Sequence, residues 1–167
     1  MPIAHYFNFN VISQPDPANR ENTIQTFQFG PHGLFAGGIV MDLEISIDVE
    51  TMRILQSTGF ALPSPMIAKG LFDTGCTITS IDDSIISNLN LKTRGYVDVA
   101  TANGQTKVTQ HIIALSFPGT NLRGKTTHLV QAANLSEQPF KVLIGRDLMS
   151  TWAITYNGPA GFVSIAD

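Results

Sequence analysis

Hydrophobic and polar residues alternate along much of the chain with the period of two that is typical of β-strands. The clearest example covers residues 41–49, where every second residue is apolar and the residues between them are polar or acidic. This pattern predicts a strand with one face in the core. Shorter β-rich runs bounded by turn residues follow at 67–73, 96–101, 107–117, 127–132, 142–144 and 162–165. We therefore expect a mainly β protein.

Helical patterns are few and short. Residues 82–89 begin with an N-cap candidate and continue with apolar residues at near-helical spacing, and residues 146–152 predict a second brief helix after Gly145. Many short strands with little helix favour a barrel or a sandwich, and no internal repeat indicates a solenoid or propeller.

The first 38 residues differ from the rest. Phe7, Phe9 and Val11 alternate with asparagines, a proline-containing break follows, and a second β-like run covers 23–29, so we expect a hairpin-like appendage. Glycines between positions 30 and 38 indicate a flexible junction. The predicted division is an N-terminal β-rich appendage at 1–38 and a domain at 39–167. Residues 59–65, with two prolines, predict a loop.

Composition narrows the function classes. A chain of 167 residues with 43% hydrophobic content can form one domain with a substantial core. The net charge of -3 and the scattered Lys and Arg residues argue against nucleic-acid or membrane partners. One cysteine excludes an internal disulfide, and four widely separated histidines give no metal-ligand spacing, so we expect no metal or cofactor. Without a signal-peptide pattern or a long apolar stretch, a soluble cytoplasmic protein is expected.

Three motifs carry the chemical interpretation. Asp73-Thr74-Gly75 follows an apolar strand, and about 30 residues later an Asn-Gly pair at 103–104 predicts a tight hairpin. Residues 142–149 then place two apolar residues and a Gly-Arg-Asp sequence before a helix. In order and spacing these motifs resemble the retropepsin family of aspartic proteases, and the resemblance spans about residues 39–165.

The resemblance implies a small, closed, barrel-like acid protease fold with one short C-terminal helix, acting as a homodimer. It implies that Asp73 is catalytic, that Thr74 hydrogen-bonds across the two-fold axis, and that Gly75 lets the substrate backbone approach. The hairpin would be the flap over an extended peptide substrate. Its substrate-binding tip would be Ala102, Asn103 and Gly104. Each motif also has a plainer interpretation, as an ordinary turn, strand or hairpin.

The chemistry explains why a single motif predicts an assembly. Hydrolysis by this route needs two carboxylates that share a proton, one acting as general base on water and the other as general acid toward the carbonyl oxygen. One chain supplies one Asp-Thr-Gly motif. A two-fold axis that brings Asp73 against its own copy completes the site, so the expected partner is a second copy of the chain.

The chain departs from the family pattern beside the motif. Cys76 follows Gly75, and residues 77 and 78 carry no acid, so the family's ion pair to the helix arginine cannot form. Arg146 would then brace the site through Asp82, Asp83 or a terminal carboxylate, with structural roles also for Gly145, Cys76 and Asp147. Cys76 either packs inertly or makes activity sensitive to oxidation. Residues 161–165 are expected at or near the dimer contact.

The interpretation that these motifs favour is an aspartic endopeptidase. The alternative keeps the fold and removes the chemistry, leaving a catalytically silent dimerisation or peptide-binding module. A third possibility, a β-rich capsid or scaffold subunit, treats Asp73-Thr74-Gly75 as a turn and leaves the Gly-Arg-Asp element unexplained.

Overall fold

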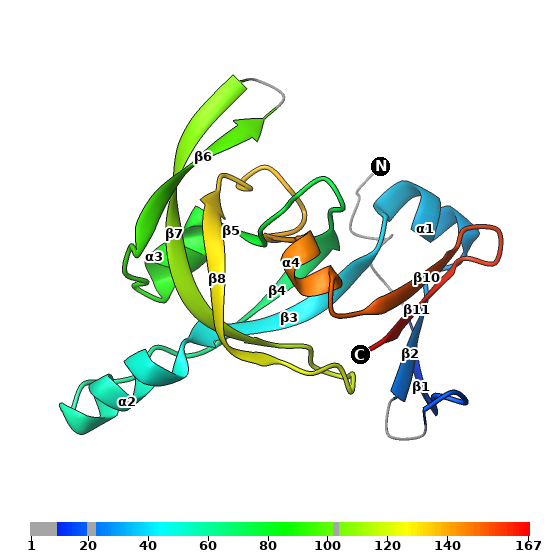
Figure 1. Ribbon diagram of the computed structural model, residues 1–167, viewed down its shortest axis with the longest axis horizontal. Coiled ribbons are helices and arrows are strands. Elements are labelled where there is room, and N and C mark those ends of the chain that lie inside the picture. Colours follow the sequence, from blue (N-terminus) through cyan, green and yellow to red (C-terminus); the bar gives the residue numbers. More distant parts are fainter. Residues whose placement is uncertain (1–9, 20–22, 102–103) are drawn as a thin grey trace.

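The computed structural model describes residues 10–19, 23–101 and 104–167, and its described part is mainly β (Figure 1). A seven-stranded sheet has the order β3-β4-β9-β5-β8-β7-β6, and β3 also pairs with β7. A four-stranded sheet has the order β1-β2-β11-β10. The strands of the first sheet are β3 (Val40–Ile47), β4 (Met66–Phe72), β5 (Ser80–Asp82), β6 (Gly95–Thr101), β7 (Gly104–Ser116), β8 (Lys125–Ala133) and β9 (Val142–Ile144). Those of the second are β1 (Asn10–Pro15), β2 (Thr23–Gln28), β10 (Ala153–Asn157) and β11 (Phe162–Ala166).

Four short helices join these strands: α1 (Pro31–Gly37), α2 (Val49–Ser57), α3 (Asp83–Asn88) and α4 (Arg146–Met149). The predictions for α3 and α4 are confirmed, although α4 ends three residues earlier than predicted. None of the described helices is long and apolar enough to cross a membrane.

The predicted strand at 41–49 is wrong at its C-terminal end. β3 stops at Ile47, and the Asp48 side chain accepts hydrogen bonds from the backbone N–H groups of Glu50 and Thr51 as the N-cap of α2. Val49 continues the alternating pattern but begins the helix. An N-cap satisfies backbone N–H donors that otherwise have no partner. This gain favours the start of a helix over the continuation of the strand.

The glycine-rich junction is also more ordered than predicted. It contains α1, which starts with Pro31 in its first turn, where the missing proline N–H costs no helical hydrogen bond. Leu34 of this helix is buried, and Gly38 ends it with a φ of 70°, a conformation that favours glycine.

The N-terminal strands share the core with the rest of the chain. β2 pairs with β11 from the C-terminus, and Phe27 and Leu34 belong to the same buried cluster as Met41, Ile144 and Ile165. The division at residue 38 stays a prediction. Where the two sheets meet, Trp152 packs against Phe72 and Phe117, with ring centroids 5.9 and 5.3 Å apart.

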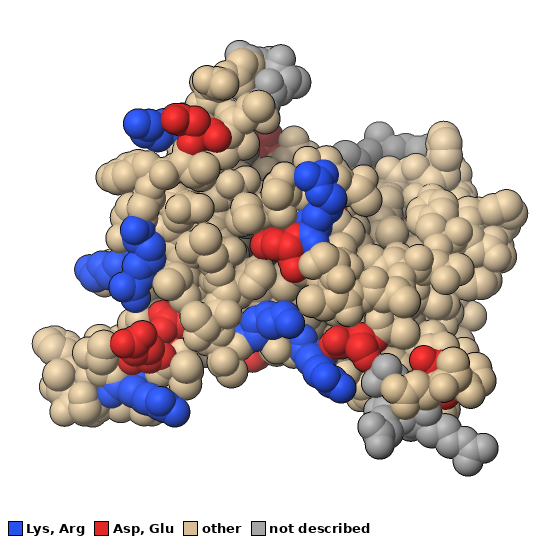
Figure 2. All heavy atoms as spheres, viewed as in Figure 1, with Lys and Arg blue, Asp and Glu red and all other residues tan. Residues whose placement is uncertain are grey.

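Two features project from this body in Figure 1: α2, and the long β6–β7 hairpin at the opposite edge. Basic and acidic side chains are interspersed on the face that Figure 2 shows, and no large area of one sign gathers there. The feature that positions the candidate site is the central strand β9, which pairs parallel with β4 and antiparallel with β5. The loop between β4 and β5 is therefore anchored on both sides of one strand, and this loop carries Asp73.

Candidate active site

Asp73 lies directly after β4, at the start of the anchored loop. Its backbone N–H donates to Ile144 O at 3.0 Å, which extends the β4–β9 pairing by one residue. Its carboxylate Oδ1 accepts from the Gly75 N–H at 2.8 Å, and its carbonyl accepts from the Cys76 N–H at 3.1 Å. A half-buried carboxylate is thus held in a tight turn at the end of a core strand.

A cavity of about 800 Å³ opens in front of Asp73. The Asp73 loop forms one wall through Gly75 and Cys76, whereas the β6–β7 hairpin forms another through Val97, Val99 and Val108. The volume lies within the range of ligand sites, roughly 300–1,000 Å³. The hairpin therefore faces the same space as the acid, and these three valines line that space while half-buried.

Of the three residues predicted at the hairpin tip, Ala102 and Asn103 lie outside the described residues. Gly104 begins β7 with a φ of 113°, which strongly favours glycine. β6 and β7 pair in register from Gly95 with Gln110 to Thr101 with Gly104, so Gly104 belongs to the strand, and the prediction of a two-residue Asn-Gly turn at 103–104 is wrong in its register.

Arg146 braces the Asp73 loop through uncharged partners. Its Nη1 donates to the Thr74 carbonyl at 2.6 Å, its Nη2 donates to Thr77 Oγ1 at 2.8 Å, and its backbone N–H donates to the Cys76 carbonyl at 2.9 Å. The expected partners Asp82, Asp83 or a terminal carboxylate are wrong, and within the described part of the chain Arg146 makes no ion pair. The loop's own oxygens lie nearer and suit the two-pronged guanidinium.

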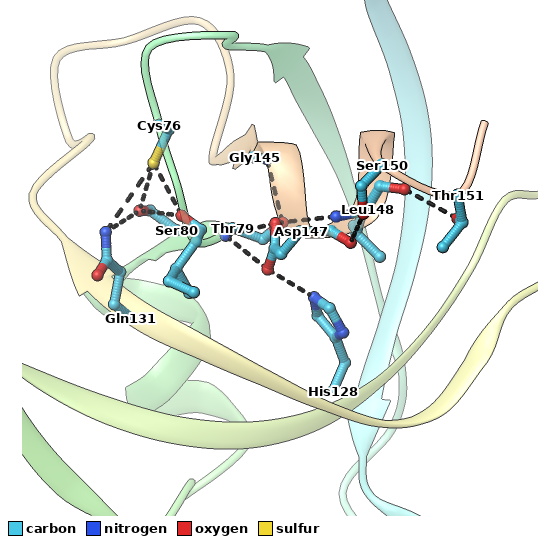
Figure 3. Close-up of polar contacts among 11 residues, drawn as sticks. Cys76, Thr79, Ser80, His128, Gln131, Gly145, Asp147, Leu148, Ser150 and Thr151 are labelled. Carbon is cyan, nitrogen blue, oxygen red and sulfur yellow. Dashed lines mark hydrogen bonds and ion pairs between the residues drawn. The ribbon is translucent and has the colours of Figure 1, made fainter. Parts of the chain in front are cut away.

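Asp147 is the most heavily bonded side chain near the loop (Figure 3). Its two carboxylate oxygens accept from the Thr79 N–H at 3.0 and 2.9 Å, and Oδ1 also accepts from Thr79 Oγ1 at 2.8 Å. His128 Nε2, from β8, reaches Oδ2 at 3.0 Å. Burial by itself raises the pKa of Asp147, but the hydrogen bonds from His128 and Thr79 outweigh it and hold that pKa below its ordinary value.

Gly145 allows α4 to sit against the loop this closely. A Cβ at this position would lie 2.7 Å from Ile78 C and from Thr79 N, both backbone atoms that cannot easily give way. The Gly145 N–H donates to Thr79 Oγ1 at 3.1 Å. The Gly-Arg-Asp sequence therefore acts as a unit in which the glycine permits contact, and the arginine and aspartate each hold a different part of the loop.

Cys76 is a free, half-buried thiol in the cavity wall. Its Sγ donates to the Ile78 carbonyl at 2.8 Å and lies 3.5 Å from Ser80 Oγ. Gln131, which sequence reasoning missed together with His128, lies beside them. A single histidine or glutamine in a strand carries no signal of its partner, because β8 reaches the loop only through the fold.

The other acidic residues near the Asp73 loop either have structural roles or lie away from the Asp73 carboxylate. Asp82 is buried as the N-cap of α3, and only Asp98, exposed on β6, joins Asp73 among the cavity-lining acids of the described chain. No cluster of three or more His, Cys, Asp or Glu residues suited to a metal occurs among residues 10–19, 23–101 and 104–167. The arrangement therefore offers carboxylate chemistry from Asp73 at the floor of an open cavity.

Comparison with known proteins agrees with this arrangement. Residues 67–148, from β4 to α4, match the family model described as aspartyl protease. The matched segment contains the Asp73 loop, the β6–β7 hairpin and the Gly-Arg-Asp element. A search of curated proteins gives no match.

Two solved structures have a similar chain path. One is a retropepsin-like aspartic protease from Rickettsia conorii, with a TM-score of 0.46 and 9% identity, covering 96% of this chain and 94% of that one. The other is the retroviral protease-like domain of Ddi1 from Leishmania major, with a TM-score of 0.39 and 12% identity, covering 71% of this chain and 81% of that one.

Proposed function

We propose that this chain is an aspartic endopeptidase that hydrolyses extended peptides as a homodimer, with Asp73 of each subunit in one shared site. The observation that carries the proposal is the placement of Asp73. Its carboxylate is fixed by the Gly75 N–H at the floor of a cavity of about 800 Å³, on a loop that Arg146 and Asp147 anchor from behind. A surface turn would need no such support.

The reaction requires the second subunit. With one proton shared between two Asp73 carboxylates, the ionised one removes a proton from water, and the protonated one donates its proton to the carbonyl oxygen of the peptide bond. Water oxygen adds to the carbonyl carbon, and collapse of the tetrahedral intermediate breaks the C–N bond as the amine takes up a proton. Like charges at close range favour such sharing.

The neighbours of Asp73 have matching roles in this proposal. Thr74 is exposed and its carbonyl accepts from Arg146, and we propose that its side chain hydrogen-bonds across the two-fold axis. Gly75 leaves room for the substrate backbone. The β6–β7 hairpin, with Ala102, Asn103 and Gly104 at its tip, closes over the peptide, pairs with it as an added strand and excludes water.

The assembly and the complete fold belong to the same proposal. The pairing of β3 with β7, together with the order of the seven strands, supports a closed barrel. The four-stranded sheet has β1 and β10 at its edges, and of these two only β10 adjoins the predicted contact strand β11, which pairs with β2 on its other side. An exposed edge strand can pair with a second copy. We place the dimer contact there, and we retain residues 1–38 as an N-terminal extension of a domain at 39–167.

The test is Asp73→Asn in the full chain, with Asp98→Asn as the matched control in the same cavity. Cleavage of an unstructured protein is followed by mass spectrometry, and dimerisation by sedimentation. We expect Asp73→Asn to abolish cleavage while the dimer persists, and Asp98→Asn to retain activity. Cleavage that survives Asp73→Asn, or an active monomer, would refute the proposal. A wild-type dimer that binds peptides without cleaving them would establish the silent binding module instead.

A further inference from the structure

The wall of the cavity beside Asp73 contains a polar cluster that the proposed chemistry does not use. It consists of Cys76, Ser80 and Gln131, all of which line the cavity (Figure 3). Gln131 Nε2 donates to Ser80 Oγ at 3.1 Å and lies 3.9 Å from Cys76 Sγ. Ser80 and Gln131 are 3% and 7% exposed, so these polar groups sit at the inner end of the cavity.

The bonds within the cluster leave one polar group without a protein partner in the described part of the chain. Both contacts of the Gln131 amide use its nitrogen, and Figure 3 shows the oxygen pointing away from Ser80 and Cys76. Among the residues that the structure describes, none donates a hydrogen bond to Gln131 Oε1. An amide oxygen that lines a cavity and has no protein donor can accept a hydrogen bond from a ligand that enters the cavity.

The charge of the cavity gives a second constraint. Its described lining contains two acids, Asp73 and Asp98, and no Lys, Arg or His. An acidic side chain entering this space would be desolvated beside like charge with no cation to offset it. The cavity therefore disfavours the binding of peptides that would place an Asp or Glu side chain in it.

We infer that the cavity selects a peptide with an amide side chain, Gln or Asn, beside the scissile bond. The substrate NH₂ group donates to Gln131 Oε1, and the substrate amide oxygen accepts from the Ser80 hydroxyl, whose own contact with the Ile78 carbonyl is long at 3.4 Å. A lysine could only donate, and a leucine would leave the Gln131 oxygen unpaired. This inference rests on the proposed function and names its substrate class.

The first experiment is cleavage of a peptide library that varies the positions on either side of the scissile bond. We expect kcat/KM for Gln or Asn at one position to exceed that for Leu by about tenfold, the factor that one neutral hydrogen bond supplies. Gln131→Leu should reverse this preference toward Leu. Gln56→Leu, the same change at an exposed position on α2 outside the cavity lining, should leave the preference unchanged.

A library that favours Leu, Lys, Asp or Glu in the wild-type protein would overturn the inference. So would a Gln preference that survives Gln131→Leu. If cleavage depends on Asp73 but shows no amide preference, the endopeptidase proposal stands and this inference fails.

A binding measurement separates the inference from catalysis. Labelled peptides with Gln or Leu at the selected position are titrated into the Asp73→Asn protein by fluorescence anisotropy, with the Gln131 side-chain NH₂ resonances followed by NMR. Tighter binding of the Gln peptide, with a shift of those resonances, supports the inference even in a protein that never cleaves. Equal affinity, or no binding of either peptide up to millimolar concentration, contradicts it.

Discussion

Replacing Asp147 with Ala tests whether the Gly-Arg-Asp element holds the Asp73 loop in place. The change removes a carboxylate that accepts from the Thr79 N–H and hydroxyl, from His128 Nε2 and from the Leu148 N–H, all between 2.8 and 3.0 Å. Thr79 is fully buried, so its backbone N–H would have no water to replace the lost acceptor.

The size of the effect follows from these donors. A buried donor left without a partner costs about 1–3 kcal/mol, and a lost hydrogen bond to a charged group costs about 1.5–3 kcal/mol. The Thr79 hydroxyl can turn to another acceptor and His128 retains some exposure, so the terms do not add in full. We expect a loss of about 3–4 kcal/mol in the free energy of unfolding, a large part of the 5–15 kcal/mol typical of a domain.

Urea unfolding at pH 7, followed by circular dichroism, measures this loss. Asp98→Ala is the matched control, because Asp98 is exposed on β6 and should change stability by less than about 0.5 kcal/mol. Asp147→Asn should cost less than Asp147→Ala, since its amide oxygen still accepts from Thr79. A loss below about 1 kcal/mol for Asp147→Ala, or one equal to that of the control, would refute the bracing role.

Two further predictions concern the same region. Gly145→Ala should lower the free energy of unfolding, measured with urea or heat, by about 1–3 kcal/mol, because the new Cβ would meet the Thr79 backbone. Gly95→Ala is the control and should lower it far less, because the new Cβ would lie 3.3 Å from a side-chain oxygen only. Equal losses of stability in the two variants would contradict the close-contact argument. Burial by itself raises the pKa of Asp82, but hydrogen bonds from Ser84 and from the Leu135 N–H outweigh burial and hold that pKa below its ordinary value of 3.8. As the pH falls, Asp82 therefore becomes protonated in the unfolded chain before it does so in the folded protein. Stability should therefore be full above about pH 5 and decline as the pH falls through 3.8 toward the folded-state pKa, and Asp82→Asn should flatten that decline; an unchanged pH profile in the variant would count against the assignment.

Local patterns of apolar, polar and turn residues were enough to predict most strands and two helices. Alternation and turn residues located β4, β6, β7, β8, β9 and β11 to within a few residues. The pattern failed where a short-range effect competed with it. At Asp48 a helix cap replaced the last two residues of a predicted strand, and in the glycine-rich segment Pro31 and the burial of Leu34 favoured a helix over a flexible junction.

Part of the candidate site could likewise be predicted from the sequence, and part of it could not. Asp73-Thr74-Gly75 and Gly145-Arg146-Asp147 could be found from the sequence because their chemistry and spacing are contained in contiguous residues. The partners of Arg146 could not be found from the sequence. The position of α4 against the loop decides which oxygens this long side chain can reach.

The sequence by itself therefore determined the resemblance to aspartic proteases, the mainly β class and the acid that we propose for catalysis, because these depend on residue type and on short spacing. Only the tertiary structure decided what surrounds that acid. The pairing of β5 with both β9 and β8 brings Gln131 of β8 to Ser80 and Cys76, 51 and 55 positions away, and His128 of β8 reaches Asp147, 19 positions away. Such contacts arise from strand pairing and packing across the whole chain, and no local pattern of residues records them.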